Sequence, residues 1–83
     1  MEKLLEIYKD QKSKEGYKYY IWLFNRDGNY FILEDDALNV SKHLGLLLEL
    51  NGCIRYLSFP YSDLDIYLPK LIRKGYKVAI IDL

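Results

Sequence analysis

Cysteine and histidine are almost absent from this sequence, because Cys53 and His43 are the only ones among 83 residues. A single thiol cannot form an intramolecular disulfide, which is typical of proteins in a reducing compartment. A zinc site needs three or four ligands at close spacing, and a Cys–His catalytic pair normally lies within a recognisable signature. Neither is present. His43 is therefore interpreted as a solvated helix residue and Cys53 as a small sheet residue, although sequence alone leaves a Cys–His pair open.

Net charge is also missing, since twelve basic residues are balanced by twelve acidic ones. A neutral chain has no long-range attraction for nucleic acid or an acidic membrane, although a local basic patch could still bind phosphate. The N-terminus has no signal peptide, and no apolar run approaches the ~18 residues that span a bilayer. No glycine begins a phosphate-loop motif. We therefore expect one cytoplasmic domain, residues 1–83, that binds no metal, nucleotide or other cofactor.

Apolar residues are plentiful, at 51% of the chain, and turn residues divide them into short periodic segments. Their spacing predicts the order helix, two strands, helix, two strands, helix, strand. The expected ranges are residues 2–15, 17–25, 30–33, 36–44, 46–50, 53–59, 62–74 and 77–81.

The ends of these segments carry recognisable chemistry. Asp35 is expected to cap the second helix, and Ser62 with Asp65 has capping-box spacing at the start of the third. Gly75 fits a left-handed cap at the end of the third helix. Asn51-Gly52 predicts a tight hairpin turn. The last strand is the most apolar and is expected at the centre of the sheet.

Charged clusters are the first candidates for binding. Glu34, Asp35 and Asp36 could ligate a divalent ion, but acidic residues are favoured at helix N-termini by the helix dipole, and we prefer that interpretation. Basic residues near the ends of the first and third helices could contact phosphates, although solvated basic residues are also expected there. These two basic clusters are Lys9, Lys12 and Lys14, and Lys70, Arg73, Lys74 and Lys77.

Two aromatic residues, Tyr30 and Phe31, follow the turn predicted at residues 25–29. Strand alternation places their side chains on opposite faces, so at most one is needed for the core. An exposed aromatic side chain here could stack on a nucleic-acid base. Exposure of either ring beside a basic surface would favour DNA binding, and burial of both would weaken that interpretation.

Two stretches resemble the N-terminal, mismatch-recognition domain of the MutS family. In the first, residues 27–44, Asp35-Asp36-Ala37 matches the acidic pair and alanine of the family pattern. The second, residues 59–81, matches at Pro60-Tyr61, Tyr67-Leu68, Lys70-Leu71, Gly75 and Val78-Ala79-Ile80. The resemblance covers about residues 18–81. It implies an α/β fold of the mixed α+β kind, with a mixed β-sheet flanked by three helices.

In the MutS family, a Phe-x-Glu motif recognises the mismatch: the phenylalanine stacks at the mispaired base and the glutamate hydrogen-bonds to it. A gapless match anchored on Asp35-Asp36-Ala37 places Asn29-Tyr30-Phe31 there. Anchoring on Gly28 instead places Tyr30 and Ile32 at the two positions. Both registers lose the glutamate.

The resemblance therefore implies a non-catalytic module that binds DNA weakly, without specific mismatch reading. The alternative is a protein-interaction module that kept the fold and lost DNA binding. The candidate DNA-binding residues are Asn29, Tyr30, Phe31, Lys70, Arg73 and Lys74.

Overall fold

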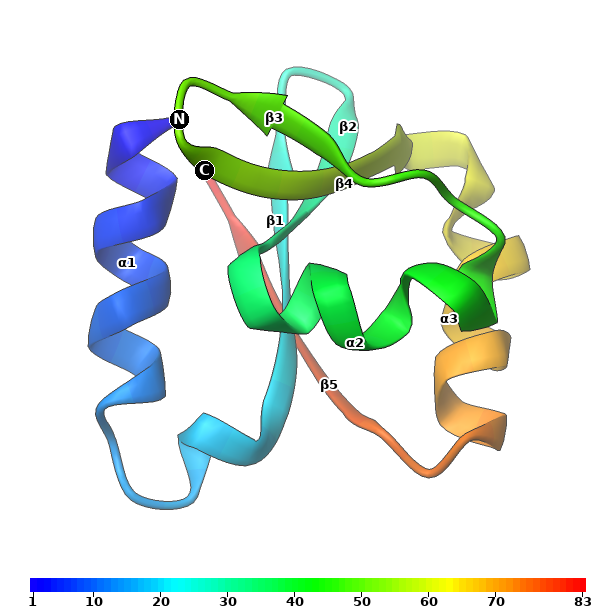
Figure 1. Ribbon diagram of the computed structural model, residues 1–83. Coiled ribbons are helices and arrows are strands. Elements are labelled where there is room, and N and C mark those ends of the chain that lie inside the picture. Colours follow the sequence, from blue (N-terminus) through cyan, green and yellow to red (C-terminus); the bar gives the residue numbers. More distant parts are fainter.

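A five-stranded mixed β-sheet runs through the middle of the molecule (Figure 1). The computed structural model describes all 83 residues. Neighbouring strands are antiparallel except β1 and β5, which run parallel, and the strand order is β3-β4-β2-β1-β5. The strands are β1 (Tyr20–Arg26), β2 (Asn29–Leu33), β3 (Glu49–Asn51), β4 (Ile54–Pro60) and β5 (Lys77–Asp82).

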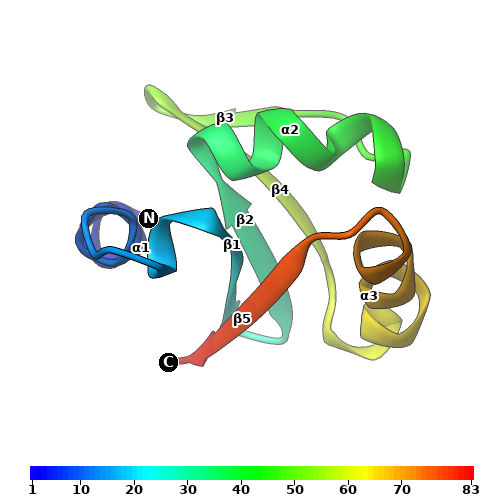
Figure 2. The same ribbon diagram turned by 90° about the horizontal axis from the view of Figure 1, so that it is seen from below.

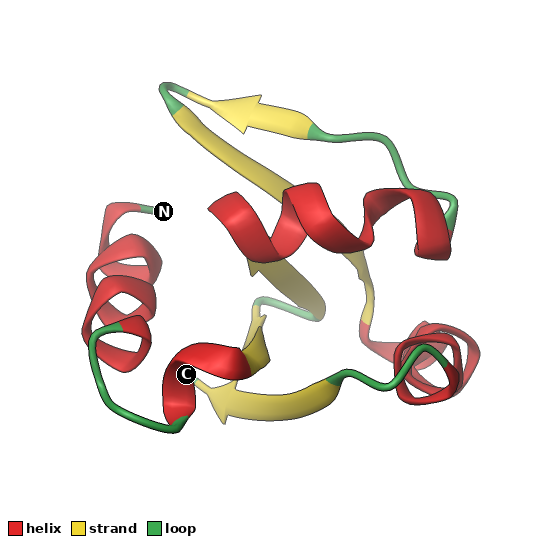
Figure 3. Ribbon diagram, turned by 60° about the horizontal axis from the view of Figure 1, so that its bottom comes forward, coloured by secondary structure: helices red, strands yellow, loops and turns green.

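Three helices flank this sheet, as Figures 2 and 3 show. They are α1 (Glu2–Lys12), α2 (Glu34–Leu44) and α3 (Leu64–Arg73). Two short 3₁₀ turns, Tyr17–Tyr19 and Tyr61–Asp63, precede β1 and α3. The predicted mixed sheet with three helices, and the predicted order of the elements, are confirmed.

Strand β1 explains why the sheet needs helices on both faces. Its alternate side chains enter two separate clusters: Ile21 and Leu23 pack with α2 and α3, whereas Trp22 and Phe24 pack with α1. All four side chains are buried. A strand with apolar side chains on both faces is stable only where both faces are covered.

The β1–β2 hairpin turn fixes where β2 begins. Arg26 pairs with Asn29, which leaves Asp27 and Gly28 as a two-residue loop. Their φ angles are 53° and 80°. Positive φ at both loop positions is the signature of the type I′ turn, which matches the twist of the two strands. Asn29 is therefore the first residue of β2.

Gly75 ends α3 in the left-handed conformation that the sequence predicted, with a φ of 87°. Its backbone N–H donates to the Ile72 carbonyl at 3.0 Å, and that of Tyr76 donates to the Leu71 carbonyl at 3.2 Å. This pair of bonds is the Schellman motif, which satisfies the last carbonyls of a helix.

Gly75→Val should lower the free energy of unfolding by about 1–2 kcal/mol, because a β-branched residue resists positive φ. A Cβ at Gly75 would meet no atom within 4 Å, so the loss comes from the backbone conformation and not from a clash. Urea denaturation measures it. Lys74→Val is the control, because Lys74 has an ordinary helical φ of −83°. An unchanged midpoint for Gly75→Val would contradict the cap.

The predicted start of the first helix agrees with the structure, but the predicted starts of α2 and α3 are wrong. Helix α2 begins at Glu34, one residue before the predicted cap Asp35, and no side chain caps it. Residues 61–63 form a 3₁₀ turn, so α3 begins at Leu64 without the predicted capping box of Ser62 and Asp65. In both places the chain enters the helix directly from a neighbouring element, and the cap chemistry is not used.

Other boundaries move because local packing competes with the strand pattern. Helix α1 ends at Lys12, three residues before the predicted end, and β1 begins at Tyr20 because residues 17–19 form a 3₁₀ turn. The strand expected at 46–50 is reduced to Glu49–Asn51. Leu46 instead closes the cap of α2, since its N–H donates to the Ser41 carbonyl at 3.1 Å. The β3–β4 turn is Gly52-Cys53, one residue later than predicted.

The expectation of a central β5 is also wrong, because β5 is an edge strand that pairs only with β1. Its apolar character comes from the two covered faces of the sheet. Val78 packs toward α3, whereas Ala79 and Ile81 pack toward α1. Ile80 remains 42% exposed.

Candidate nucleic-acid interface

The predicted base-contacting residues lie beside the β1–β2 turn. Asn29 is partly exposed and pairs with Pro60 of β4. The Tyr61 N–H donates to the Gly28 carbonyl at 2.8 Å, which ties the turn to the segment that enters α3. We call this region the hairpin end: residues 25–29, residues 60–65 and the last residues of β5, where Asp82 pairs with Asn25.

Neither aromatic candidate projects freely into solvent. Tyr30 is only 3% exposed, and its ring lies 5.5 Å from that of Phe59 and 5.4 Å from that of Tyr61. Phe31 is partly buried on the opposite face, with its ring 6.0 Å from that of Tyr56. The predicted alternation is therefore present, but both rings pack against other aromatic side chains of the domain. Stacking on a base would require one of them to leave these contacts.

The predicted basic residues converge with a fourth residue on one depression of about 390 Å³. Lys70 and Arg73 come from the last turn of α3, and Lys74 is the residue that follows it. His43 comes from the last turn of α2. No carboxylate lines this depression, which we call the basic cleft. Sequence reasoning missed His43, because only the packing of α2 against α3 brings it there.

The hairpin end includes the start of α3, whereas the basic cleft lies at its C-terminal end. Figure 1 shows the course of α3 between these two ends. A helix rises 1.5 Å per residue, so Leu64 at the start of α3 and Arg73 at its end lie roughly 13 Å apart along the axis. The structure therefore brings Lys70, Arg73 and Lys74 together but leaves Asn29, Tyr30 and Phe31 in a different region. The six candidates do not form one site.

The other predicted basic cluster, Lys9, Lys12 and Lys14, is largely neutralised by ion pairs within the molecule. Lys12 forms an ion pair with Asp36 at 2.6 Å, and Lys14 pairs with Asp10 at 3.4 Å. Only Lys9 of that cluster has no ion-pair partner. Phosphate binding through this part of α1 is correspondingly disfavoured.

The acidic residues at the start of α2 have two different cationic partners: Arg55 pairs with Glu34 and Asp35, and Lys12 pairs with Asp36. Glu34 has a φ of 48° and accepts the Arg55 N–H at 2.8 Å, and Asp35 pairs with the Arg55 guanidinium at 3.4 Å. Asp36 turns inward, is 2% exposed, and accepts the Trp22 N–H at 3.0 Å. The three carboxylates do not converge on one point, and sequence gave no sign of the inward turn of Asp36.

Burial is the largest influence on the ionisation of the Asp36 carboxylate. It raises the pKa of Asp36 above its ordinary value, while the hydrogen bond from Lys12 acts in the opposite direction. Burial likewise raises the pKa of Tyr8 to about 12, with the nearby Asp36 charge as a second cause. Asp36 contacts α1 at two residues: its carboxylate pairs with Lys12, and its backbone N–H donates to the Tyr8 hydroxyl at 3.4 Å.

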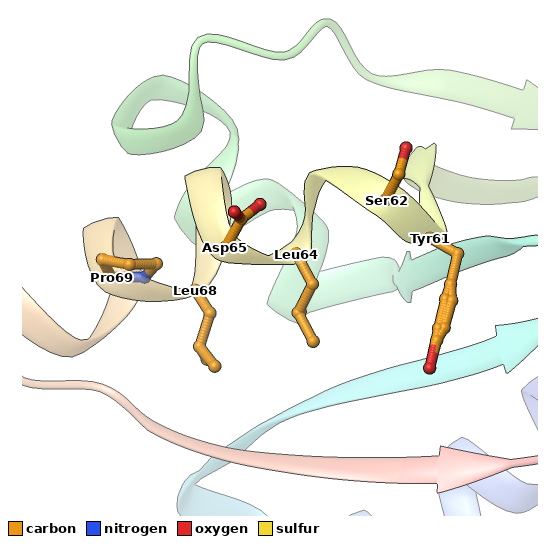
Figure 4. A pocket seen from close by; sticks show the side chains of 6 residues that line it. All are labelled: Tyr61, Ser62, Leu64, Asp65, Leu68 and Pro69. Atoms are coloured by element: carbon orange, nitrogen blue, oxygen red, sulfur yellow. The ribbon is translucent and has the colours of Figure 1, made fainter.

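A second surface is apolar. A groove of about 430 Å³ runs along α3, and in it Tyr61, Leu64 and Leu68 point toward β5 (Figure 4). The remaining lining residues are Ser62, Asp65 and Pro69. The apolar side chains of α3 are therefore only partly buried in the core, and part of this apolar surface stays open.

The fold and these surfaces define a small mixed-sheet domain with a basic cleft and an apolar groove along α3. The chain matches the family model of MutS domain I over residues 3–83 and belongs to that family. The predicted resemblance is confirmed. No helix is both long and apolar enough to cross a membrane.

Individual relatives agree with this assignment. The chain is 42% identical over 82 residues to the DNA mismatch repair protein MutS of Thermotoga neapolitana, covering 99% of this chain and 10% of that protein. The same protein of Fervidobacterium nodosum is 43% identical over 77 residues, covering 93% and 9%. That of Chlorobium chlorochromatii is 41% identical over 70 residues, covering 83% and 8%. The chain thus spans about a tenth of the length of these relatives.

Proposed function

We propose that residues 1–83 form one non-catalytic module that associates weakly with DNA and does not discriminate mismatched from matched duplexes. Membership of the MutS domain I family carries this proposal, because the relatives are named as DNA mismatch repair proteins. The basic cleft supplies the phosphate-contacting surface, with Lys70, Arg73 and Lys74 as its residues.

The weak mismatch reading follows from the residues beside the β1–β2 turn. Wedging an aromatic ring between bases requires unstacking, which costs a few kcal/mol per step and must be offset by contacts made only in the kinked state. Either register replaces the family's glutamate by Phe31 or Ile32, neither of which accepts a hydrogen bond. Tyr30 would have to leave its contacts with Phe59 and Tyr61 to act as a wedge.

The module should bind a G·T duplex no more than a few-fold more tightly than the matched duplex, because stacking of about 1–3 kcal/mol cannot clearly exceed the unstacking cost. Fluorescence anisotropy with two labelled duplexes of equal length, titrated side by side at low salt, measures this ratio. Binding to both should weaken together as salt is raised. A tenfold or larger G·T preference that Tyr30→Ala abolishes would overturn the proposal.

A non-catalytic role is also consistent with the positions of the two reactive side chains. Cys53 lies in the β3–β4 turn, next to β4, whose Arg55 contacts Glu34 at the start of α2. His43 lies in the last turn of the same helix. An eleven-residue helix is roughly 16 Å long, so these two side chains do not form the Cys–His pair that the sequence left open.

A second candidate function is a protein-interaction module. The observation that favours it is the apolar groove of α3, whose Leu64 and Leu68 side chains point toward β5 (Figure 4), the strand whose outer edge is unpaired. An extended apolar peptide that adds a strand to such an edge gains main-chain hydrogen bonds and can place alternate side chains in an adjoining groove. This function predicts no DNA binding even at low salt, which the same anisotropy titration tests.

A further inference from the structure

Charge is distributed very unevenly over this neutral molecule. The hairpin end carries one basic residue, Arg26, against four acidic ones. The opposite end, formed by the last turns of α2 and α3 and the start of β5, carries five basic residues and no acidic one. The acidic residues are Asp27, Asp63, Asp65 and Asp82, and the basic ones are Lys42, Lys70, Arg73, Lys74 and Lys77.

None of these five basic side chains is neutralised by an ion pair, although other basic residues of the chain are. The paired ones are Lys12, Lys14, Lys18, Arg26 and Arg55. The positive charge at this end is therefore open to a ligand.

Helix capping does not account for the basic cleft. Basic side chains near a helix C-terminus often hydrogen-bond to its last carbonyls. Here those carbonyls already accept backbone N–H groups: Ser41 from Leu46 and Lys42 from Gly45 in α2, with the equivalent bonds in α3. No side chain of the cleft donates a hydrogen bond to either helix end.

Two of the side chains that line the basic cleft, Lys70 and His43, contact aromatic rings. The Lys70 ammonium lies 5.5 Å from the centre of the Tyr67 ring, and the His43 ring lies 6.1 Å from that of Tyr76. Arg73 and Lys74 remain exposed at its rim. A guanidinium can bind two phosphate oxygens at once, and an ammonium adds a mobile point charge, so this set matches a phosphodiester.

We propose that a backbone phosphate of nucleic acid binds in the basic cleft, so that DNA lies across the ends of α2 and α3. This inference rests on the proposed function, which already assigns the phosphate contact to the basic cleft, and adds the orientation of the DNA on the module. The DNA then faces away from the hairpin end, where the family's mismatch-reading residues belong and where four carboxylates repel phosphate. Phosphate contacts of this kind position a protein on DNA without reading its sequence.

The test compares two charge-reversal variants that change net charge equally. Arg73→Glu with Lys74→Glu alters the cleft, whereas Lys3→Glu with Lys9→Glu alters exposed residues of α1 that form no ion pair. The cleft variant should bind duplex DNA about tenfold more weakly or worse and reduce the slope of log affinity against log salt by about 2. The control should change affinity less than about threefold. Equal weakening by both variants would overturn the inference.

Amide chemical shifts of the unmodified protein, titrated with a short matched duplex at low salt, give a readout that needs no variant to fold. Shifts concentrated at residues 42–46 and 70–77 support the cleft. Shifts concentrated at residues 25–31 and 60–65 overturn it while leaving the proposed function intact. No binding at any salt concentration overturns both.

Discussion

Lys12→Met should lower the free energy of unfolding by about 3 kcal/mol at neutral pH, the low end of the range for a broken buried ion pair. The variant leaves the Asp36 carboxylate 2% exposed and without its cation. It also removes the hydrogen bonds from the Lys12 ammonium to the carbonyls of Lys18 and Tyr20, at 2.9 and 2.7 Å. A chain of this size has about 5 kcal/mol of stability, so an unfolded fraction should become measurable.

The size of this loss should depend on pH with a defined sign. Because burial raises the pKa of Asp36 in the folded state, the protonated form favours folding, and that contribution is lost as pH rises through the folded pKa. Removing Lys12 raises the folded pKa further, so the loss becomes larger. The difference between Lys12→Met and the unmodified protein should therefore be greater at pH 8 than at pH 4, as measured by urea denaturation.

Two further variants make this result specific. Adding Asp36→Asn to Lys12→Met should recover part of the stability, because the amide oxygen can still accept the Trp22 N–H without a buried charge. Lys14→Met should cost less than about 1 kcal/mol, since its partner Asp10 is exposed. If Lys12→Met and Lys14→Met lower the free energy of unfolding by the same small amount, the ion pair between Lys12 and Asp36 does not stabilise the fold.

Leu23→Ala should lower the free energy of unfolding by about 3 kcal/mol, whereas Ile80→Ala should cost less than half as much. The two residues are register partners on neighbouring strands, β1 and β5. Leu23 is fully buried, so its truncation leaves a cavity between sheet and helices, but Ile80 is 42% exposed and loses few contacts. Parallel urea denaturation of both variants measures the difference.

This comparison tests the observed strand order directly. A central position for β5, as its apolar sequence suggested, would bury Ile80 and make the two losses similar. Similar losses would therefore contradict the edge position, whereas a clear difference supports it. Comparable denaturant dependence in both variants serves as the control that each still unfolds in one cooperative step.

The features that sequence predicted well are those that depend on local chemistry. The loop at Asp27 and Gly28 and the cap at Gly75 each require positive φ, which few residues tolerate, so they can be located from residue type. Family resemblance then supplied the mixed sheet, and the order of its helices and strands followed from apolar spacing.

The features that sequence missed depend on contacts between distant segments. Apolar spacing says that β5 has two covered faces but not how many strands it pairs with, so its edge position was not predictable. The inward turn of Asp36 depends on Lys12 and Trp22, which lie 24 and 14 residues away in the sequence. The acidic run therefore looked like a solvated helix start.

The candidate site was only partly predictable for the same reason. Lys70, Arg73 and Lys74 share one helix turn, so their proximity follows from sequence, whereas His43 joins them only through the packing of α2 on α3. Tyr30 looked available for stacking because strand alternation assigns faces but not the number of side chains that fill each face. Phe59 and Tyr61, from the end of β4 and the turn that follows it, surround it.

The edge position of β5 exposes the chain to unwanted self-association. An apolar strand with a free row of backbone N–H and C=O groups is a template on which a second chain can pair. Lys77 and Asp82 stand at the two ends of β5, and both are exposed. Charges at these positions act as gatekeepers, because a misaligned second strand would bring an apolar side chain against one of them. Lys77 thus has a role in opposing strand pairing at this edge that is separate from any contact with phosphate.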